Sequence, residues 1–514
     1  MRRLLVLSVA CVLAVAGMPS AQGDALKTAA DTLGAANVKT LGFAGSGANF
    51  SLGQNFTPND PWPRVPVTTY TSLINFDTAS MRVEILREMG ATMPRGGGAP
   101  FFGQQRQNQQ VGGNYAWNVP VPNPPPPGAA PAAPPAGAPP AAAPAAPPAA
   151  PAPGNQVERM LFIWSTPQGF VKGAMANNAT QKAVAAGTEV SYMVGGKYKI
   201  TGLINARGEV EKVQTWIDQP IVGDMLIETT YSDYKKFGGV LFPGHIVQSQ
   251  DGFPTLDLNV AGVSTNMAVD ITVPDNVRNA PPPPPVMVTS EKLAEGVYYL
   301  TGGTHHSLAI EMKDHIVLVD TPLNEARAQA VIDKTKELIP KKPIRYIVTS
   351  HHHWDHLGGI RTAMAEGATI VTHASNKTFL EHVAKTSHTI SPDKLSMMKN
   401  AKPVKIMPVQ ALGKLTDGTR TVELHLLTGY EHTGDMLVVY LPKEKILAEP
   451  DAFTPPAMAG TPLIPPAVPY AAALYDNILR LKLDVQTIAP FHGGRKTDVA
   501  EVGKAAGKSG ANTN

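Results

Sequence analysis

The sequence predicts two folded parts, an antiparallel β-rich domain followed by an α/β domain. Short alternating runs separated by glycine-rich turns occupy much of residues 24–279, and such runs are typical of an antiparallel sheet. Apolar strands and helical patterns alternate after residue 285, as they do in α/β domains. Proline-rich segments at 120–154 and 280–285 interrupt the chain. The length of 514 residues agrees with roughly two to four domains.

Residues 1–23 have the pattern of a cleaved secretory signal peptide. Arg2 and Arg3 precede an apolar run at 4–16, and residues 21–23 form a small-x-small cleavage candidate. The apolar run is too short to span a bilayer comfortably. We therefore predict a periplasmic or secreted protein without an integral membrane span after signal cleavage. Because the single cysteine is Cys11, the mature chain would contain no disulfide.

The N-terminal β-rich domain is expected in two parts, residues 24–119 and 155–279. The runs predicted to be strands are 65–76, 81–88, 159–166, 198–205, 210–217, 225–234 and 245–250. The stretch 234–243 loosely resembles a hairpin of periplasmic sheet domains that carry lipoproteins or other apolar cargo. The segment 120–154 is almost entirely proline and alanine, which predicts an extended linker or an insertion within this one domain.

The α/β domain is expected over residues 286–503, after a stiff proline linker at 280–285. Its predicted elements are strands at 297–300, 307–312, 315–320, 344–349, 437–441, 445–448 and 487–490, and a helix at 324–338. The strand at 315–320 ends in an acid, Asp320, and the strand at 344–349 leads directly to His351. Residues 504–514 are small and polar and are predicted to be disordered.

The strongest chemical signal is the pattern His-x-His-x-Asp-His at residues 351–356. In an extended segment His351 and His353 point to the same side, so one metal ion can bind both. Asp355 and His356 follow at the turn and can face a second metal ion. The group follows an apolar strand, and α/β folds place ligand chemistry at the carboxyl ends of strands. These residues predict a metal site.

Three later segments fit the same scheme. Each brings a ligand-capable residue from a strand to a loop: His432 within 429–435, an acid within 449–451, and His492 within 491–494. Histidine nitrogens and carboxylate oxygens suit zinc, and the mature chain offers no thiolate.

Other residues near these motifs are given lesser roles. His352 is expected to point away from the metals. His305 and His306 lie in a loop before a strand, where surface histidines are expected more often than residues lining a pocket mouth. Trp354 is expected either to form a pocket wall or to pack under the loop. The proline-rich stretch 451–469 is predicted to be an irregular loop over the site, with a mobile lid as the alternative.

Over roughly residues 286–502 these motifs resemble those of the metallo-β-lactamase superfamily of binuclear metallohydrolases. The resemblance implies an αββα sandwich with seven metal ligands: His351, His353 and His432 for the first metal, Asp355, His356 and His492 for the second, and Asp451 as the bridge. Asp320 would support the site without ligating. Because the usual glycine before the bridging acid is replaced by proline, Glu449 is the alternative to Asp451.

The resemblance implies a zinc-dependent hydrolase with two zinc ions, or iron in their place, and the signal-like pattern of residues 1–23 adds that it is exported. A metal-bound hydroxide would attack the carbonyl of a β-lactam, lactone or thioester, or a phosphoryl group. Asp355 would also be catalytic, by orienting the hydroxide or passing a proton to the leaving group. Two other functions remain: a mononuclear-iron oxidoreductase on the same scaffold, and a carrier of an apolar ligand through the N-terminal domain.

The composition limits the partners. Charged residues make up 17% of the chain, the formal net charge is +3, and no lysine- or arginine-rich run occurs. A protein that binds nucleic acid by neutralising phosphates needs such a patch. We therefore expect a small-molecule substrate and no nucleic-acid partner.

Overall fold

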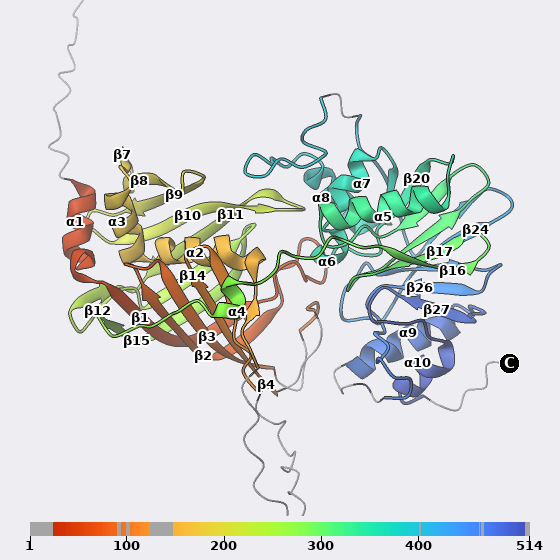
Figure 1. Ribbon diagram of the computed structural model, residues 1–514, viewed down its shortest axis with the longest axis horizontal. Helices are drawn as coiled ribbons and strands as arrows, with labels where there is room; N and C mark the ends of the chain where they lie inside the picture. The colour runs from red at the N-terminus through yellow and green to blue at the C-terminus, as the bar shows by residue number, and fades with distance from the viewer. Residues whose placement is uncertain are drawn as a thin grey trace, which may run out of the picture.

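The computed structural model describes residues 24–89, 94–98, 103–123, 147–399, 402–461, 463 and 467–508. The predicted signal peptide, most of the Pro/Ala-rich segment and most of the predicted tail therefore lie outside the described residues. Figure 1 shows a sheet-rich N-terminal domain beside a C-terminal domain in which helices flank two sheets. None of the described helices is long and apolar enough to cross a membrane.

The N-terminal domain is built on one antiparallel sheet, as predicted, with thirteen strands among the described residues. In spatial order they are β6 (Ala150–Pro151), β5 (Tyr115–Asn118), β4 (Gly103–Gly112), β3 (Ser80–Met89), β2 (Arg64–Asn75), β1 (Thr40–Phe50), β15 (Phe253–Thr265), β14 (His245–Gln250), β11 (Gly223–Ser232), β10 (Val210–Gln219), β9 (Tyr198–Ile204), β8 (Gly187–Val194) and β7 (Thr180–Val184). A separate hairpin, β12 (Lys235–Phe237) and β13 (Val240–Phe242), lies within the stretch predicted to be one.

The Pro/Ala-rich segment lies between neighbouring strands of this sheet. Strand β5 precedes the segment, β6 is formed near its end, and the two strands are hydrogen-bonded through Trp117 paired with Pro151 and Asn118 paired with Ala150. Such pairing fits an insertion within one domain and not a linker between two domains.

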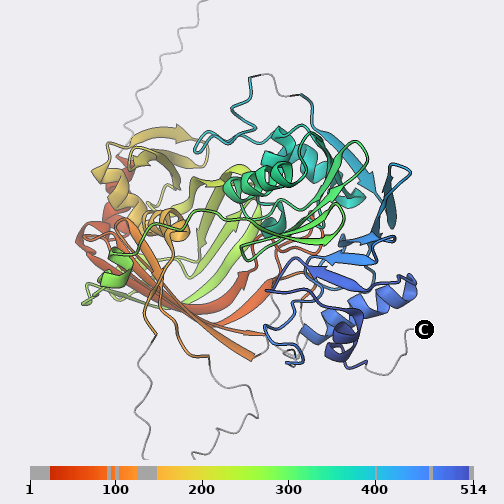
Figure 2. The same cartoon turned by 45° about the vertical axis from the view of Figure 1, so that its right-hand side comes forward.

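Three helices lie against one face of the large sheet (Figures 1 and 2): α1 (Ala25–Thr32), α2 (Gln156–Ser165) and α3 (Pro167–Ala176). Leu161 of α2 and Phe170 of α3 join Phe43 of β1 in a single buried apolar core. The strand predicted at 159–166 is therefore wrong, because this segment is α2. The centre of α2, residues 160–164, is apolar and at least partly buried throughout, and so short an apolar run cannot be assigned to helix or strand by periodicity.

The C-terminal domain contains two sheets. Over the described residues the larger sheet has, in spatial order, β16 (Thr289–Ala294), β17 (Val297–Thr301), β18 (Ser307–Glu311), β19 (Ile316–Val319), β20 (Ile344–Val348), β21 (Thr369–His373) and β22 (Lys405–Val409). The smaller sheet has β23 (Leu412–Thr416), β24 (Thr421–Leu426), β25 (Leu437–Leu441), β26 (Ile446–Glu449) and β27 (Thr487–Pro490).

Helices cover the outer faces of both sheets. Those on the larger sheet are α5 (Glu325–Leu338), α6 (Trp354–Leu357), α7 (Ile360–Ala365) and α8 (Lys377–Val383), and those on the smaller sheet are α9 (Val468–Arg480) and α10 (Val499–Ala505). The remaining helices are α4 (Asp275–Arg278) and three short 3₁₀ turns, η1 (Ala35–Asn37), η2 (Pro153–Asn155) and η3 (Ala374–Asn376). Helix α5 begins at the predicted place because the Asn324 side chain accepts a hydrogen bond from the Arg327 N–H group and caps it.

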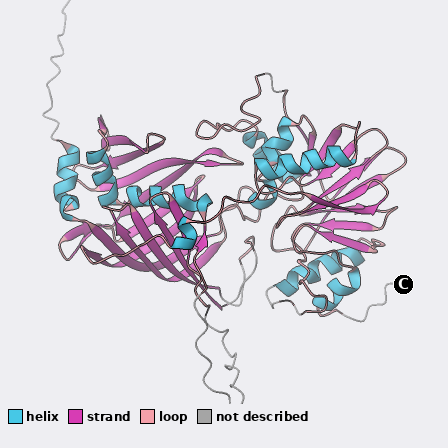
Figure 3. Cartoon of the chain, in the orientation of Figure 1, coloured by secondary structure: helices cyan, strands magenta, loops and turns pink. Residues whose placement is uncertain are grey.

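Three apolar cores separate the four layers of this domain. Val348 of the larger sheet and Val439 of the smaller sheet lie in the core between the sheets. Val331 of α5 packs in the core under the first helical layer, and Leu474 of α9 in the core under the second. The order helix, sheet, sheet, helix (Figure 3) is the αββα sandwich that the resemblance implied.

Parallel pairing determines where the site forms. Strands β19, β20 and β21 are parallel neighbours, and so are β26 and β27. The carboxyl ends of parallel strands meet at one edge of a sheet, which is where ligands usually bind in α/β folds. The loops after β20, β26 and β27 carry the predicted ligands to this edge.

Several segments of the N-terminal domain contact the C-terminal domain, and two of them matter for the argument below. The loop between β1 and β2, residues 51–63, contacts α6, and we call it the docking loop. Its Trp62 packs against Trp354 with ring centroids 5.2 Å apart. On the other segment, Asp224 of β11 accepts hydrogen bonds from the N–H groups of Thr389 at 2.9 Å and Ile390 at 3.0 Å.

Candidate metal centre

The His-x-His-x-Asp-His segment follows the carboxyl end of β20, a strand inside the larger sheet. His351 and His353 lie in the loop before α6, and Asp355 and His356 lie on the first turn of that helix. His351, His353 and His356 are almost completely buried. The predicted turn from strand to helix thus places four potential ligands at one point in the fold.

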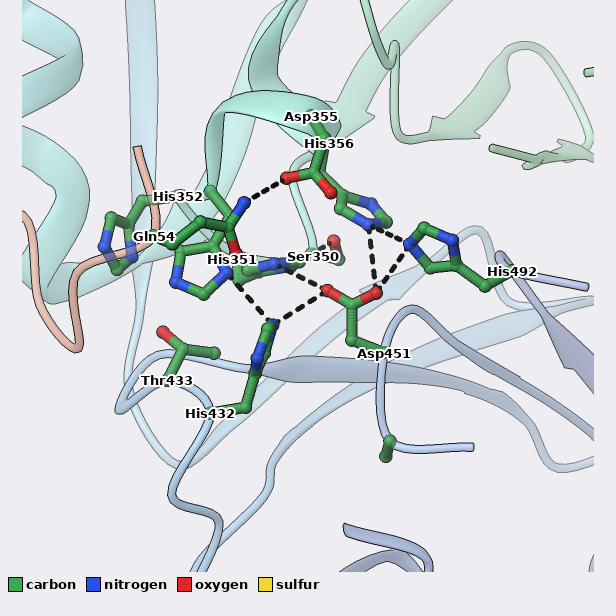
Figure 4. Close-up of polar contacts among 12 residues, drawn as sticks. Gln54, Ser350, His351, His352, Asp355, His356, His432, Thr433, Asp451 and His492 are labelled. Carbon is green, nitrogen blue, oxygen red and sulfur yellow. Dashed lines mark hydrogen bonds and ion pairs between the residues drawn. The ribbon is translucent and has the colours of Figure 1, made fainter. Parts of the chain in front are cut away.

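The first cluster of potential ligands comprises His351, His353, His432 and Asp451, whose ligand atoms all lie within 4.8 Å of one another. His353 Nδ1 and His432 Nε2 face each other at 3.0 Å. Asp451 Oδ2 lies 3.0 Å from His351 Nε2 and 3.0 Å from His432 Nε2 (Figure 4). These are the predicted ligands of the first metal, with the predicted bridging acid beside them.

The second cluster comprises His305, Asp355, His356 and His492. His356 Nε2 lies 3.1 Å from His492 Nε2. Asp451 Oδ1 lies 2.6 Å from His492 Nε2 and 3.3 Å from His356 Nε2. The carboxylate of Asp451 thus presents one oxygen to each cluster.

Glu449 has a different environment from Asp451. It is fully buried, and its Oε2 accepts hydrogen bonds from the N–H groups of Ala452 at 2.7 Å and Phe453 at 3.2 Å. Burial raises the pKa of Glu449 to about 8, although these two N–H groups favour its charged form. Glu449 therefore shapes the turn that carries Asp451, and Asp451 occupies the position between the clusters.

The surface location expected for His305 and His306 is wrong. Both side chains are buried, and His305 Nε2 lies 3.1 Å from Asp355 Oδ2, within the second cluster. His306 Nε2 donates a hydrogen bond to the Gly493 carbonyl at 2.6 Å. The cause is a backbone bridge between His305 and His492, which holds the loop before β18 against the end of β27. No local sequence pattern indicates this long-range pairing.

Three further predicted residues surround the clusters without joining them. Asp320 accepts a hydrogen bond from the Ser350 N–H group at 2.7 Å, and its Oδ2 lies 2.9 Å from His356 Nδ1, so it supports a ligand loop. His352 turns toward Asp435, with 2.9 Å between Nδ1 and Oδ1. Trp354 packs against Trp62 of the docking loop and is not among the described residues that line the pocket, so neither role expected for it is confirmed.

The protonation states of His351, His353 and Asp451 suit metal ligation. Burial lowers the pKa of His351, and burial together with the neighbouring His432 lowers the pKa of His353 well below its usual value. Both rings are thus neutral and offer a lone pair. Burial opposes ionisation of Asp451, but the nearby His356 and His492 outweigh it and hold the pKa of Asp451 well below the ordinary range. Metal ligands must be deprotonated in this way.

The donor set fits metal ions. His351 Nε2 is buried and forms no hydrogen bond with any described residue, although it lies 3.0 Å from the Asp451 carboxylate. Two pairs of imidazole nitrogens also face each other at 3.0 and 3.1 Å. A cation is the partner that such converging lone pairs lack, and nitrogen and oxygen donors suit zinc or iron.

A pocket of about 250 Å³ opens over Asp451. Its described lining residues are Gln54, Gly98, Asp355, His432, Asp451, Ala452, Phe453, Thr454, Leu463, Ala467, Tyr470 and His492. Several described residues of the irregular stretch after β26 line the pocket, which agrees with the loop predicted over the site, although α9 already begins at Val468 and residues 462 and 464–466 lie outside the described residues. Gln54 and Gly98 come from the N-terminal domain, and no sequence signal predicted this contribution.

A comparison with known proteins matches the part of the chain that carries both clusters. The sequence model described as the metallo-beta-lactamase superfamily matches residues 300–492. A linear primary-alkylsulfatase from a Pseudomonas species is 28% identical over 134 residues, which are 25% of this chain and 20% of that protein. The chain therefore aligns with only a fifth of the length of this relative.

Solved structures of metallo-beta-lactamases are similar to part of this chain. One from Pontibacter korlensis has 20% identity and a TM-score of 0.34, covering 43% of this chain and 98% of its own. The FIM-1 enzyme from Pseudomonas aeruginosa, in its mono-zinc form, has 21% identity and a TM-score of 0.33, covering 44% and 96%. The sequence match and the αββα order together show that the C-terminal domain, over residues 300–492, belongs to the metallo-beta-lactamase superfamily.

Proposed function

We propose that the chain is a zinc-dependent hydrolase that cleaves a small carbonyl compound, such as a β-lactam, lactone or thioester, carrying an apolar group. The observation that carries this proposal is the position of Asp451, with one carboxylate oxygen toward each histidine cluster at the floor of a pocket. Phe453 and Leu463 offer an apolar wall to the substrate. The described lining residues include no lysine or arginine, which favours a carbonyl over a dianionic phosphoryl group.

Bound metal ions would polarise the substrate oxygen and lower the pKa of a water molecule. Asp355 stands in the pocket wall, where it can accept a hydrogen bond from the attacking water. Burial opposes ionisation of Asp355, but the contact with His305 and the charge of His356 hold its pKa below the usual range. Asp355 is therefore present as a carboxylate and suited to orienting this water.

Tyr470 adds a hydrogen-bond donor to the pocket wall. Its hydroxyl is buried and has no hydrogen-bond partner among the described residues. Burial raises the pKa of Tyr470 to about 12, so the hydroxyl keeps its proton at neutral pH. A donor held in this way can stabilise negative charge that develops on a substrate oxygen.

A substrate panel with and without a chelator tests the function. The panel contains a chromogenic cephalosporin, a homoserine lactone, a glutathione thioester, a phosphodiester and, because of the relative's name, a linear alkyl sulfate. We expect chelator-sensitive cleavage of a carbonyl substrate, abolished in His351→Ala and retained in His382→Ala, an exposed histidine outside the clusters. Cleavage that persists without metal would contradict the proposal.

Metal analysis separates zinc from the iron alternative. Two bound zinc ions and a colourless protein would support the hydrolase. One bound iron, a coloured protein and oxidation of a persulfide would instead support the oxidoreductase. The carrier alternative has less support, because α1, α2 and α3 already cover one face of the N-terminal sheet with buried side chains.

We also propose export to the periplasm or secretion, on the pattern of residues 1–23. Expression with these residues should yield a processed protein that begins near Asp24 outside the cytoplasm. An unprocessed cytoplasmic protein would contradict export and leave the proposed chemistry unaffected.

A further inference from the structure

The docking loop of the N-terminal domain touches the ligand-bearing segments of the other domain. Gln54 Nε2 donates a hydrogen bond to Asp355 Oδ1 at 2.9 Å across 301 residues of sequence (Figure 4). The next residue, Asn55, accepts at its backbone carbonyl a hydrogen bond of 2.9 Å from His353 Nε2. Two predicted metal ligands, one in each cluster, are thus contacted by one short loop.

The Asn55 carbonyl determines how the His353 ring presents its nitrogens. A carbonyl only accepts, so the proton of the ring lies on Nε2 and the lone pair lies on Nδ1. Nδ1 is the atom that faces His432 in the first cluster. A hydrogen bond at the far nitrogen is how proteins usually orient a metal-binding histidine.

The carboxylate of Asp355 is held from both domains. Gln54 contacts Oδ1 at 2.9 Å from the N-terminal domain, and His305 Nε2 lies 3.1 Å from Oδ2 within the C-terminal domain. Gln54 also lines the pocket. With both oxygens contacted, the rotation of the carboxylate about its side-chain bond is restricted.

Close backbone contacts hold the docking loop in place. The Trp354 N–H group donates to the Gly53 carbonyl at 3.1 Å, and a Cβ atom on Gly53 would lie 2.5 Å from the Trp354 ring. On the next ligand loop, the Gly434 N–H group donates to the Phe56 carbonyl at 2.9 Å. The loop is therefore built into the site from two sides.

We propose that the N-terminal domain completes the metal centre through the docking loop, and that Gln54 is a positioning residue for Asp355. The effect that this role of Gln54 has on turnover rests on the proposed hydrolase function, whereas its effect on metal binding does not. Loss of the Gln54 amide frees the Asp355 carboxylate to rotate and weakens binding at the second cluster, to which Asp355 belongs.

The experiment uses full-length variants titrated with Co²⁺ against a competing chelator, with the visible spectrum recorded. Gln54→Ala removes the amide, and Gln54→Met removes the donor but keeps most of the volume. We expect both variants to bind the second Co²⁺ about 10–100-fold more weakly, with an altered spectrum and the first Co²⁺ little affected. In substrate assays we expect kcat to fall and KM to change little.

Asp224→Ala is the matched control, because it weakens an interdomain contact away from the docking loop without touching the clusters. We expect unchanged Co²⁺ affinities and kinetics in this variant. Wild-type Co²⁺ affinity in both Gln54 variants would overturn the inference, as would the same loss in Asp224→Ala. Weaker second-site binding in the Gln54 variants, with no hydrolysis by any form, would support this inference and contradict only the proposed function.

Discussion

The two domains contribute to the candidate site in different ways. The C-terminal domain supplies all seven proposed ligands as side chains from loops and from helix α6, where the surrounding strands and cores are buried. The N-terminal domain contacts two of these ligands, with the amide of Gln54 and the backbone carbonyl of Asn55. Changes in the first group should remove metal, whereas changes in the second should reorient ligands that remain.

The largest effect should follow from replacing Asp451, the residue shared by both clusters. We expect Asp451→Ala to weaken binding of both metal ions, whereas His351→Ala affects mainly the first. The loss of hydrolysis should exceed the roughly 10²–10³-fold loss typical of removing a single transition-state hydrogen-bond donor. Metal content by mass spectrometry checks this. Glu449→Gln tests Glu449 as the alternative bridging acid. If Glu449→Gln lost both metal ions while Asp451→Ala kept them, Glu449 and not Asp451 would be the bridging acid.

A smaller effect should come from forcing the domains apart at the docking loop. In Gly53→Val a side chain would enter the space of the Trp354 ring, and the φ of +73° adds backbone strain. We expect destabilisation of about 1–3 kcal/mol from overpacking, together with reduced hydrolysis. Gly252→Val is the control, because its φ is +83° but nothing lies within 4 Å of its Cβ position. Equal losses of hydrolysis in the two variants would mean that the docking loop has no special role.

Tyr470→Phe should have an effect confined to turnover. We expect kcat to fall about 10²–10³-fold, with metal content unchanged, because only a hydrogen bond to the developing charge is removed. Tyr430 makes a matched control, since its buried hydroxyl likewise has no hydrogen-bond partner among the described residues but does not line the pocket. A similar fall in kcat in Tyr430→Phe would argue against a substrate contact by Tyr470.

The smallest effect concerns the interdomain contact of Asp224 with Thr389 and Ile390 and its dependence on pH. Burial opposes ionisation of Asp224, but hydrogen bonds from Ile390 and Thr389 outweigh it and lower its pKa. The stabilisation is therefore complete above the unfolded pKa of about 3.9 and is lost as pH falls through the lower folded value. We expect Asp224→Ala to cost about 1–2 kcal/mol at pH 7. Melting curves should show this difference shrinking below pH 4, and a constant difference would contradict the assignment.

The sequence indicated which residues gather at the candidate site better than it indicated their surroundings. The His-x-His-x-Asp-His run and the later His432 and His492 are recognisable because chemistry and strand position coincide in a few residues. The roles of Gln54 and His305 depend on contacts across 301 and 187 residues, to Asp355 and His492, which no local pattern encodes. Helix α2 was predicted as a strand because burial on nearly all sides hides its period.

The most direct test of a catalytic metal centre is the metal content of the full-length protein together with its hydrolysis of the carbonyl substrates before and after chelation. We expect two metal ions per chain, loss of hydrolysis when they are removed, and recovery when zinc is restored. A protein that binds no metal, or that hydrolyses its substrate equally well after chelation, would contradict a catalytic metal centre built around Asp451.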